Sequence, residues 1–209
     1  MATYQAKVSG ISSLLLHRWS EAKEVEEATR PIHVERRDPR TEAEAVCYRR
    51  RDGTIYVPGA QFARMLRDAG SAHKQRGSRK SLRYIVPAAI IVLADDITLL
   101  NGDGRAFTDF EIDSRPVVIP STKGRIMRHR PRFNVPWSLE FSVEVDPTLI
   151  DADTALQLLT EGGRRLGIGD YRPSSGGPFG RFAVVSWEEL APGEVTAPVA
   201  KRGASRKRA

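Results

Sequence analysis

The chain has 209 residues, 40% of them hydrophobic, enough to bury one substantial core without disulfides or a structural metal. Its single cysteine, Cys47, excludes an internal disulfide and a cysteine-rich zinc site, so we expect a reducing compartment and no cofactor. No stretch reaches the roughly 20 apolar residues of a membrane helix. The first ten residues also lack a secretory pattern, and we therefore expect a cytoplasmic protein.

The formal net charge of +7 is distributed unevenly along the chain. Residues 195–209 carry five cations and no acid, which leaves +2 for the rest. Acidic residues gather in 21–27 and more loosely in 95–113, while two basic clusters oppose them. Clustered cations are typical of phosphate-binding surfaces. The basic clusters consist of Lys74, Arg76, Arg79, Lys80 and Arg83, and of Arg115, Lys123, Arg125, Arg128, Arg130 and Arg132.

The N-terminal segments predict a strand and then an irregular insertion. Apolar character in 4–8 and 12–16 predicts a first strand that is broken or bent near Gly10. The polar stretch 21–44 contains Pro31 and Pro39, which argue against one long helix and favour an irregular surface insertion that can include one helical turn.

A hairpin and a helix are predicted next. Asp52-Gly53 lies between the β-prone runs 46–48 and 54–57, which is a strong hairpin signal. The helix that follows ends at Gly70. Its one-face apolar residues are Phe62, Met65, Leu66 and Ala69.

The middle of the chain predicts a loop, a buried strand and a basic hairpin. Residues 71–81 are polar and basic and predict the loop, whereas the apolar run 84–93 predicts the buried strand, which 98–100 extends. Residues 110–119 and 126–133 flank a turn at 121–124 and predict a long hairpin.

The C-terminal part predicts a strand, a helix, a glycine-rich loop and a last strand. Residues 137–145 alternate between apolar and polar, as in a strand with one wet face. Asp151 or Asp153 caps a helix that extends to Leu166 and is weakened at its end by Gly162-Gly163. The glycine-rich loop 167–180 leads into the strand 181–187. We expect the basic tail, 195–209, to be disordered.

Taken together, the elements predict an α+β fold. The order suits one elaborated ferredoxin-like or RRM-like βαββαβ domain over residues 1–194, with β-hairpin insertions and a C-terminal glycine-rich loop. Periodicity alone does not select this fold uniquely.

Two segments resemble a known family. The strand, Pro-Gly and helix segment at 56–67 resembles the RAMP superfamily, especially the CRISPR backbone subunits. The helix 154–166, the Gly-Ile-Gly at 167–169 and Gly180-Arg181-Phe182 are similar to that superfamily's C-terminal glycine-rich loop. The resemblance implies an RRM-like domain that grips single-stranded RNA along a groove, often polymerised along a guide, with a β-hairpin thumb. A phage or mobile-element relative outside an immune complex also fits the resemblance.

The chain departs from the family pattern in the first segment. The family has a small polar pair before a lysine, whereas this chain has Ala60, Gln61 and Ala63, with Arg64 one place later. Arg64 is therefore the substitute candidate for an RNA contact.

The glycine-rich loop is the first candidate binding element. Its backbone N–H groups could reach a phosphate, Arg164, Arg165 and Arg172 could neutralise it, and Tyr171 could stack on a base. The alternative is that Gly167 and Gly169 merely end a helix and the rest of the loop makes a tight connection.

The basic hairpin is the second candidate, a thumb crossing a nucleic-acid strand with His129 and Phe133 available to stack. A solvated hairpin or an oligomer contact is the alternative. The cluster in 74–83 carries the same two interpretations. The candidate contacts are Arg64, Lys74, Arg76, Arg79, Lys80, Lys123, Arg125, Arg128, Arg130, Arg132, Arg164, Arg165, Tyr171 and Arg172.

We therefore expect non-catalytic binding of single-stranded RNA, or of DNA, by a homo-oligomer or a subunit of a ribonucleoprotein, and no membrane partner. A second interpretation is a metal-independent endoribonuclease that uses His17, His33 or His129 as general acid or base. A third is a self-assembling protein in which the acidic run of one copy meets the basic hairpin of the next. The three tryptophans are expected to be core or interface anchors rather than base platforms.

Overall fold

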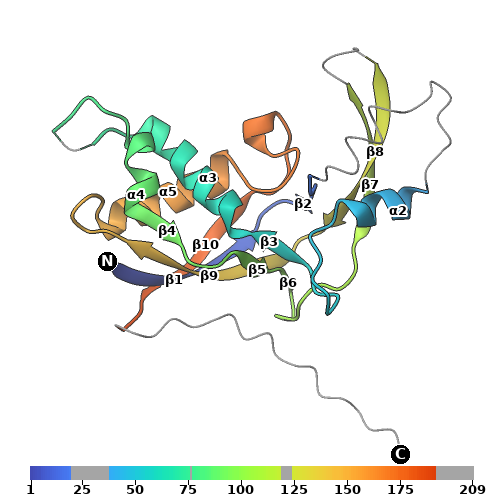
Figure 1. Cartoon of the computed structure of the whole chain (residues 1–209), viewed down its shortest axis with the longest axis horizontal. Helices are drawn as coiled ribbons and strands as arrows, with labels where there is room; N and C mark the ends of the chain where they lie inside the picture. Colours follow the sequence, from blue (N-terminus) through green and yellow to red (C-terminus); the bar gives the residue numbers. More distant parts are fainter. Residues whose placement is uncertain (20–37, 76, 119–123, 192–209) are drawn as a thin grey trace, which may run out of the picture.

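The computed structural model describes residues 1–19, 38–75, 77–118 and 124–191 (Figure 1). Its centre is an antiparallel sheet in the order β10-β1-β9-β4, with the short β6 (Leu100–Asn101) also paired to β9. Two long helices, α3 and α5, lie between core strands in the sequence. The core elements are β1 (Ala2–Gly10), α3 (Gly59–Ala69), β4 (Ile90–Val92), β9 (Trp137–Val145), α5 (Ala152–Arg165) and β10 (Phe182–Glu189).

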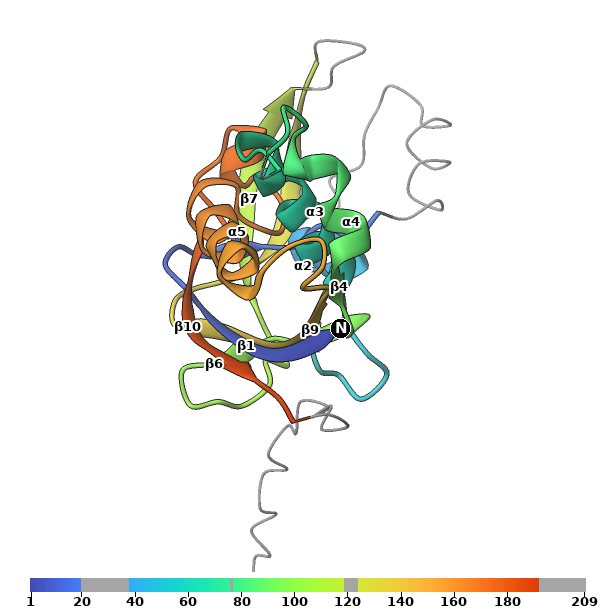
Figure 2. The same cartoon turned by 90° about the vertical axis from the view of Figure 1, so that its left-hand side faces the viewer.

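This strand order confirms the predicted βαββαβ core. The first and third core strands, β1 and β9, lie at the centre, and the second and fourth, β4 and β10, flank them. Figure 2 shows α3 and α5 on the same side of the curved sheet. The predicted α+β class is therefore confirmed, with mostly antiparallel sheets and few helices.

The periodicity of the sequence explains how the helices meet the sheet. In β9, Leu139, Phe141 and Val143 alternate with polar residues and are buried beneath the helices. Phe62 of α3 contacts Phe141 of β9 and Phe182 of β10. This aromatic cluster is the junction of the helical layer with the sheet.

The two adjacent glycines of α5 are required for close packing and do not end the helix. A Cβ at Gly162 would lie 2.8 Å from the sulfur of Met65 in α3, and one at Gly163 would lie 2.5 Å from the ring of Phe182. The helix continues past both glycines to Arg165. The predicted extent of the helix is therefore confirmed, and close packing of the two glycines offsets their low helical propensity.

The basic hairpin is also confirmed. β7 (Glu111–Val118) and β8 (Arg125–Phe133) pair along their length, and β2 (Leu14–Leu15) adds a third strand at the base. β1 and β2 thus form two strands in different sheets, with the bend at Gly10, where a Cβ would collide with Trp137. Figure 1 shows the hairpin projecting from the core beside α2 (Pro39–Ala45).

The apolar run 84–93 does not form one buried strand as predicted. It contains the end of the 3-10 helix η2 (Leu82–Tyr84), the short helix α4 (Val86–Ala89) and only then β4. Pro87 lies in the first turn of α4, where its missing N–H costs nothing, and it could not have donated to a strand. Tyr84 is 80% exposed, so the run is not continuously buried.

The structure adds detail to two further predictions. Pro39 argues against one long helix through this stretch, and it begins the seven-residue α2, where the Asp38 side chain accepts a hydrogen bond from the Thr41 N–H. The Asp52-Gly53 turn folds, with a bridge between Arg49 and Ile55. The hairpin extends to Tyr56, whose N–H donates to the Tyr48 carbonyl at 3.1 Å, and β3 (Tyr56–Pro58) pairs on its other edge with β5 (Asp96–Thr98).

The remaining described elements are short. The 3-10 turn η1 (Gly70–Ala72) follows α3, and η3 (Pro173–Ser175) lies within the glycine-rich loop. No helix among the described residues is both long and apolar enough to cross a membrane.

Candidate nucleic-acid interface

The side of the sheet opposite the helices is a poor surface for a phosphate chain. RRM domains stack bases on aromatic residues of the sheet. The register of β1 with β9 pairs Lys7 with Glu140, and their side chains lie 2.7 Å apart. The side chains that these two central strands direct away from the helices are Thr3, Gln5, Lys7, Ser9, Ser138, Glu140, Ser142 and Glu144. This set contains no aromatic residue and more acid than base.

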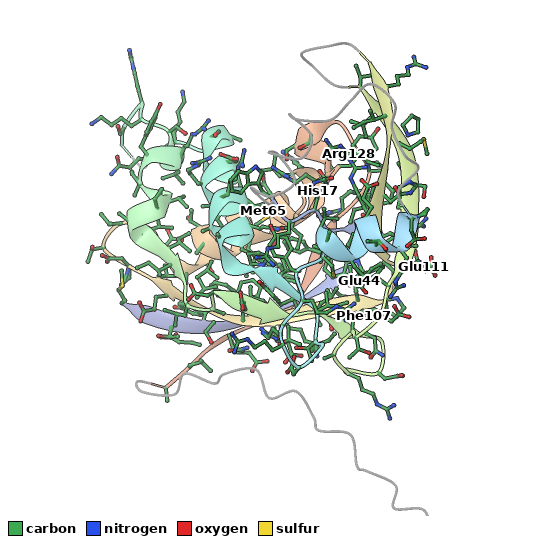
Figure 3. All side chains as sticks on the ribbon, turned by 45° about the vertical axis from the view of Figure 1, so that its right-hand side comes forward. His17, Glu44, Met65, Phe107, Glu111 and Arg128 are labelled. Carbon is green, nitrogen blue, oxygen red and sulfur yellow. The ribbon has the colours of Figure 1, made fainter. Side chains whose placement is uncertain are left out.

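A groove of about 250 Å³ lies on the helical side, between α3 and the glycine-rich loop. Arg64 of α3 and Arg172 of the loop both line it, although they are far apart in the sequence. Its other lining residues are His17, Tyr48, Gln61, Met65, Asp68, Leu166, Gly167, Ile168, Gly169, Asp170 and Ser174. Figure 3 shows Met65, His17 and Arg128 following one another from α3 towards the hairpin.

The backbone of the glycine-rich loop is held by the protein itself. The N–H of Ile168 donates to the Gly180 carbonyl at 2.9 Å, and the N–H of Gly169 donates to Oε1 of Gln61 at 2.9 Å. The N–H groups of Gly167, Asp170, Gly176, Gly177 and Gly180 likewise donate to backbone carbonyls. The expectation that these N–H groups receive a phosphate was therefore wrong, since each already has an acceptor.

Two glycines of the loop lie so close to backbone carbonyl groups that a side chain would not fit. Gly180 has φ +69°, and a Cβ there would overlap the carbonyl oxygen of Ile168. A Cβ at Gly177 would overlap the carbonyl oxygen of Tyr171. The alternative interpretation, in which the glycines end a helix and the rest of the loop makes a tight connection, therefore describes the backbone of this loop.

Asp170 joins this loop to the hairpin. Its Oδ2 lies 2.6 Å from Nε of Arg130 in β8 and 3.6 Å from Nδ1 of His17. The Arg130 N–H does not point at the oxygen, so this contact is an ion pair rather than a directed hydrogen bond. Burial by itself would raise the pKa of Asp170, but His17, the charge of Arg130 and the N–H of Tyr171 hold that pKa at about 2.

The hairpin cations divide into anchored and accessible residues. Arg130 is only 7% exposed, so it holds the hairpin to the loop and is not a surface contact as predicted. Arg132 donates to the Ser13 hydroxyl and lies near the Phe179 ring. Arg125 is exposed and Arg128 half-buried, and these two remain candidates for a ligand.

The two predicted stacking residues of the hairpin behave differently. Phe133 is buried and packs against Phe107 and Phe110, so it cannot stack on a base. His129 lies across from Ser114, with Nδ1 2.7 Å from the hydroxyl oxygen. Its neighbours Arg128 and Arg130 point to the other face of the hairpin, since side chains alternate along a strand.

The other predicted contacts are scattered. Arg164 and Arg165 are exposed at the end of α5, and Arg165 lies 3.6 Å from Glu161. Lys74, Arg79 and Lys80 are exposed in the loop between η1 and η2, which Figure 1 places at the opposite end of the molecule from the hairpin. The predicted contacts Arg76 and Lys123 lie outside the described residues, as does His33.

Sequence reasoning missed the residues that assemble this region. Arg115 of β7 lies 4.6 Å from the centre of the Phe179 ring, and Asp170 binds Arg130, so both link the hairpin to the loop. Arg115 belongs to one of the basic clusters of the sequence, but no local sequence pattern indicated that it would contact Phe179. Trp19, expected to be an anchor, is exposed beside the start of an undescribed segment.

Within the described ranges, no three His, Cys, Asp or Glu residues gather as metal ligands. No family model and no curated protein matches the sequence. The structure is similar to that of Cmr6 from Pyrococcus furiosus, with 13% identity and a TM-score of 0.41 over 87% of this chain and 97% of that one. It is also similar to a chain of a Type IV-B CRISPR complex, with 13% identity and a TM-score of 0.44 over 93% of each chain.

Likenesses of this size do not say what the chain binds.

Proposed function

We propose that this chain binds single-stranded nucleic acid, RNA in the first place, without cleaving it and as a subunit of a ribonucleoprotein assembly. The strand would lie in the groove between α3 and the glycine-rich loop and continue towards the hairpin. The observation that carries the proposal is the convergence of Arg64 and Arg172 on one groove.

The distribution of charge supports this path. Arg128 extends the cationic side chains onto the face of the hairpin that the Asp170–Arg130 ion pair fixes beside the loop, and Arg125 adds exposed charge near the tip, on the opposite face. The opposite face of the sheet offers acidic residues, which repel phosphate. Because the backbone N–H groups of the loop are occupied, affinity should come from arginine side chains and depend strongly on salt.

Fluorescence anisotropy against single-stranded RNA, single-stranded DNA and duplex, at several salt concentrations, tests the proposal. Full-length and 1–195 proteins separate the groove from the basic tail. The double variant Arg125→Ala/Arg128→Ala should weaken binding and reduce the salt slope by about 0.7 for each phosphate that an arginine no longer neutralises. Arg130 is left intact because its removal would disturb the anchor.

The matched control is Arg79→Ala/Lys80→Ala, which removes the same charge at the far end of the molecule. This control should bind nearly as the parent protein does. Equal weakening of binding in the two variants would show that overall charge, and not this path, determines binding. No binding of the 1–195 protein to any single strand would overturn the proposal and favour a self-assembling protein.

A metal-independent ribonuclease is the second candidate, and one observation favours it. His17 lines the groove with Nδ1 3.6 Å from the carboxylate of Asp170. A carboxylate beside one ring nitrogen can orient a histidine for general acid or base catalysis. Gel analysis of the same RNA probe decides between the candidates: cleavage that disappears in His17→Ala would establish the enzyme, whereas an intact probe supports binding alone.

A further inference from the structure

Tyr171 has an unusual backbone conformation. Its φ of +46° makes it the one residue other than glycine with a positive φ in the part of the chain that the structure describes. For a bulky side chain this left-handed conformation is strained, and it persists only where the surroundings impose it. Such strain is often found at binding sites.

Three contacts impose this conformation. The N–H of Tyr171 donates to Oδ1 of Asp170 at 2.9 Å, and the carbonyl of Tyr171 accepts from the N–H of Phe179 at 3.3 Å. Gly177 packs so closely against that carbonyl that no Cβ fits between them. Asp170 is itself held by Arg130 and His17, so the hairpin and the groove both contribute to the position of Tyr171.

The conformation keeps the tyrosine ring at the surface. Tyr171 is 37% exposed, whereas Phe179, whose ring centre lies 6.1 Å away, is buried. Arg115 supports both rings, with its guanidinium 4.6 Å from the centre of Phe179 and 5.9 Å from that of Tyr171. Asp113 in turn fixes Arg115 at 2.7 Å. A hydrophobic ring that only needed burial could have packed like Phe179 without backbone strain.

The position of the ring suits a nucleobase. Asp170 and Arg172, its neighbours in sequence, line the groove. Aromatic stacking contributes to the binding of single strands and requires a base that is unpaired and accessible. The central strands of the sheet supply no such ring on their open side.

We propose that Tyr171 is a stacking platform for one unpaired nucleobase, with Arg115 as the positioning residue that supports its ring. This inference rests on the proposed function, because Arg64 and Arg172 of the groove would bring the strand to the platform. It adds a reason for preferring single strands to duplexes, in which bases are not free to stack on a side chain.

Two probes separate stacking from charge. One is a short oligouridylate, and the other is an abasic ribose-phosphate oligomer of the same length, which keeps the phosphates and lacks the bases. Tyr171→Ala should weaken binding of the oligouridylate about tenfold or more and leave binding of the abasic oligomer unchanged. Tyr171→Phe, which keeps the ring, should bind both probes as the parent protein does.

Tyr84→Ala is the matched control, since Tyr84 is another exposed tyrosine and lies away from the groove residues. It should leave binding of both probes unchanged. An equal weakening for both probes in Tyr171→Ala, or no change for either, would overturn the platform while leaving the proposed function standing. Failure of the parent protein to bind oligouridylate would instead overturn the proposed function.

Photocrosslinking of the unmodified protein gives an answer even if Tyr171→Ala does not fold. Oligouridylate containing 5-iodouridine should crosslink to Tyr171, as located by mass spectrometry of the digested complex. A crosslink confined to Trp19 or Tyr84, the two other strongly exposed aromatic residues of the described chain, would overturn the platform.

Discussion

The glycine-rich loop and the β7–β8 hairpin are neighbours, yet they are stabilised in opposite ways. In the loop, backbone contacts dominate: successive N–H groups donate within the protein, and glycines permit contacts that a Cβ would prevent. In the hairpin, cross-strand pairing forms the ribbon, and side chains such as Arg130 attach its base to the loop. Arg125, towards its tip, is exposed.

This difference separates two tasks. The loop is a rigid support that holds Tyr171, Arg172 and Asp170 in place, whereas the outer hairpin presents charge to solvent. Substitutions in the loop backbone should therefore change stability first, and substitutions in the outer hairpin should change binding first.

The largest effect is expected at Gly180. Gly180→Ala would place a methyl group against the carbonyl of Ile168 at a positive φ, so overpacking and backbone strain add to about 3 kcal/mol or more. For a chain of this size, that corresponds to a decrease of roughly 6–12 °C in the thermal unfolding midpoint. Differential scanning calorimetry measures it.

Gly176→Ala is the control for this prediction. Gly176 also has a positive φ, but nothing lies within 4 Å of the Cβ it would gain, so only the backbone strain of about 1–2 kcal/mol remains. If Gly180→Ala lowers the midpoint no further than Gly176→Ala does, the loop is not held by close backbone packing.

The next effect is expected at Asp170. Its pKa falls from an ordinary value of 3.8 to about 2 in the folded protein, which corresponds to about 2 kcal/mol of stabilisation at neutral pH. Because the folded pKa is the lower one, this stabilisation is complete above the unfolded pKa and is lost as the pH falls through the folded pKa. Asp170→Asn should thus cost about 2 kcal/mol at pH 7, and progressively less between about pH 5 and pH 2.

Urea unfolding at a series of pH values measures this difference. Asp103→Asn, in an exposed turn, is the control and should stay within about 0.5 kcal/mol of the parent protein at pH 7. A cost for Asp170→Asn that stays constant down to pH 2 would contradict the ion-pair explanation.

The local elements could be predicted from the sequence because their signals are local. Each signal is contained in one short stretch of sequence. Examples are the alternation in 137–145, the one-face spacing in α3 and the paired runs of the hairpin. The prediction of one buried strand over 84–93 was wrong because it relied on the apolar composition of the run. Pro87 in that run favours the first turn of a helix.

The candidate site was less predictable because its contacts join distant positions. A basic cluster in the sequence does not show that Arg130 faces inward, since its partner Asp170 comes from another element forty positions later. A glycine-rich sequence likewise does not reveal whether its backbone N–H groups donate to a ligand or to carbonyl groups of the same chain. Both arrangements require a close approach that a Cβ atom would prevent. Only the fold distinguishes these cases.

The smallest stability effect is expected in the outer hairpin. Arg125 is exposed, so Arg125→Ala should change the free energy of unfolding by no more than about 0.5 kcal/mol. In single-stranded RNA binding, the same substitution should reduce the salt slope by about 0.7 if Arg125 binds one phosphate. Chemical denaturation and anisotropy on one preparation measure both quantities. A large decrease in stability would show that Arg125 stabilises the hairpin. That result would contradict the distinction between a loop whose residues determine stability and an outer hairpin whose residues determine binding.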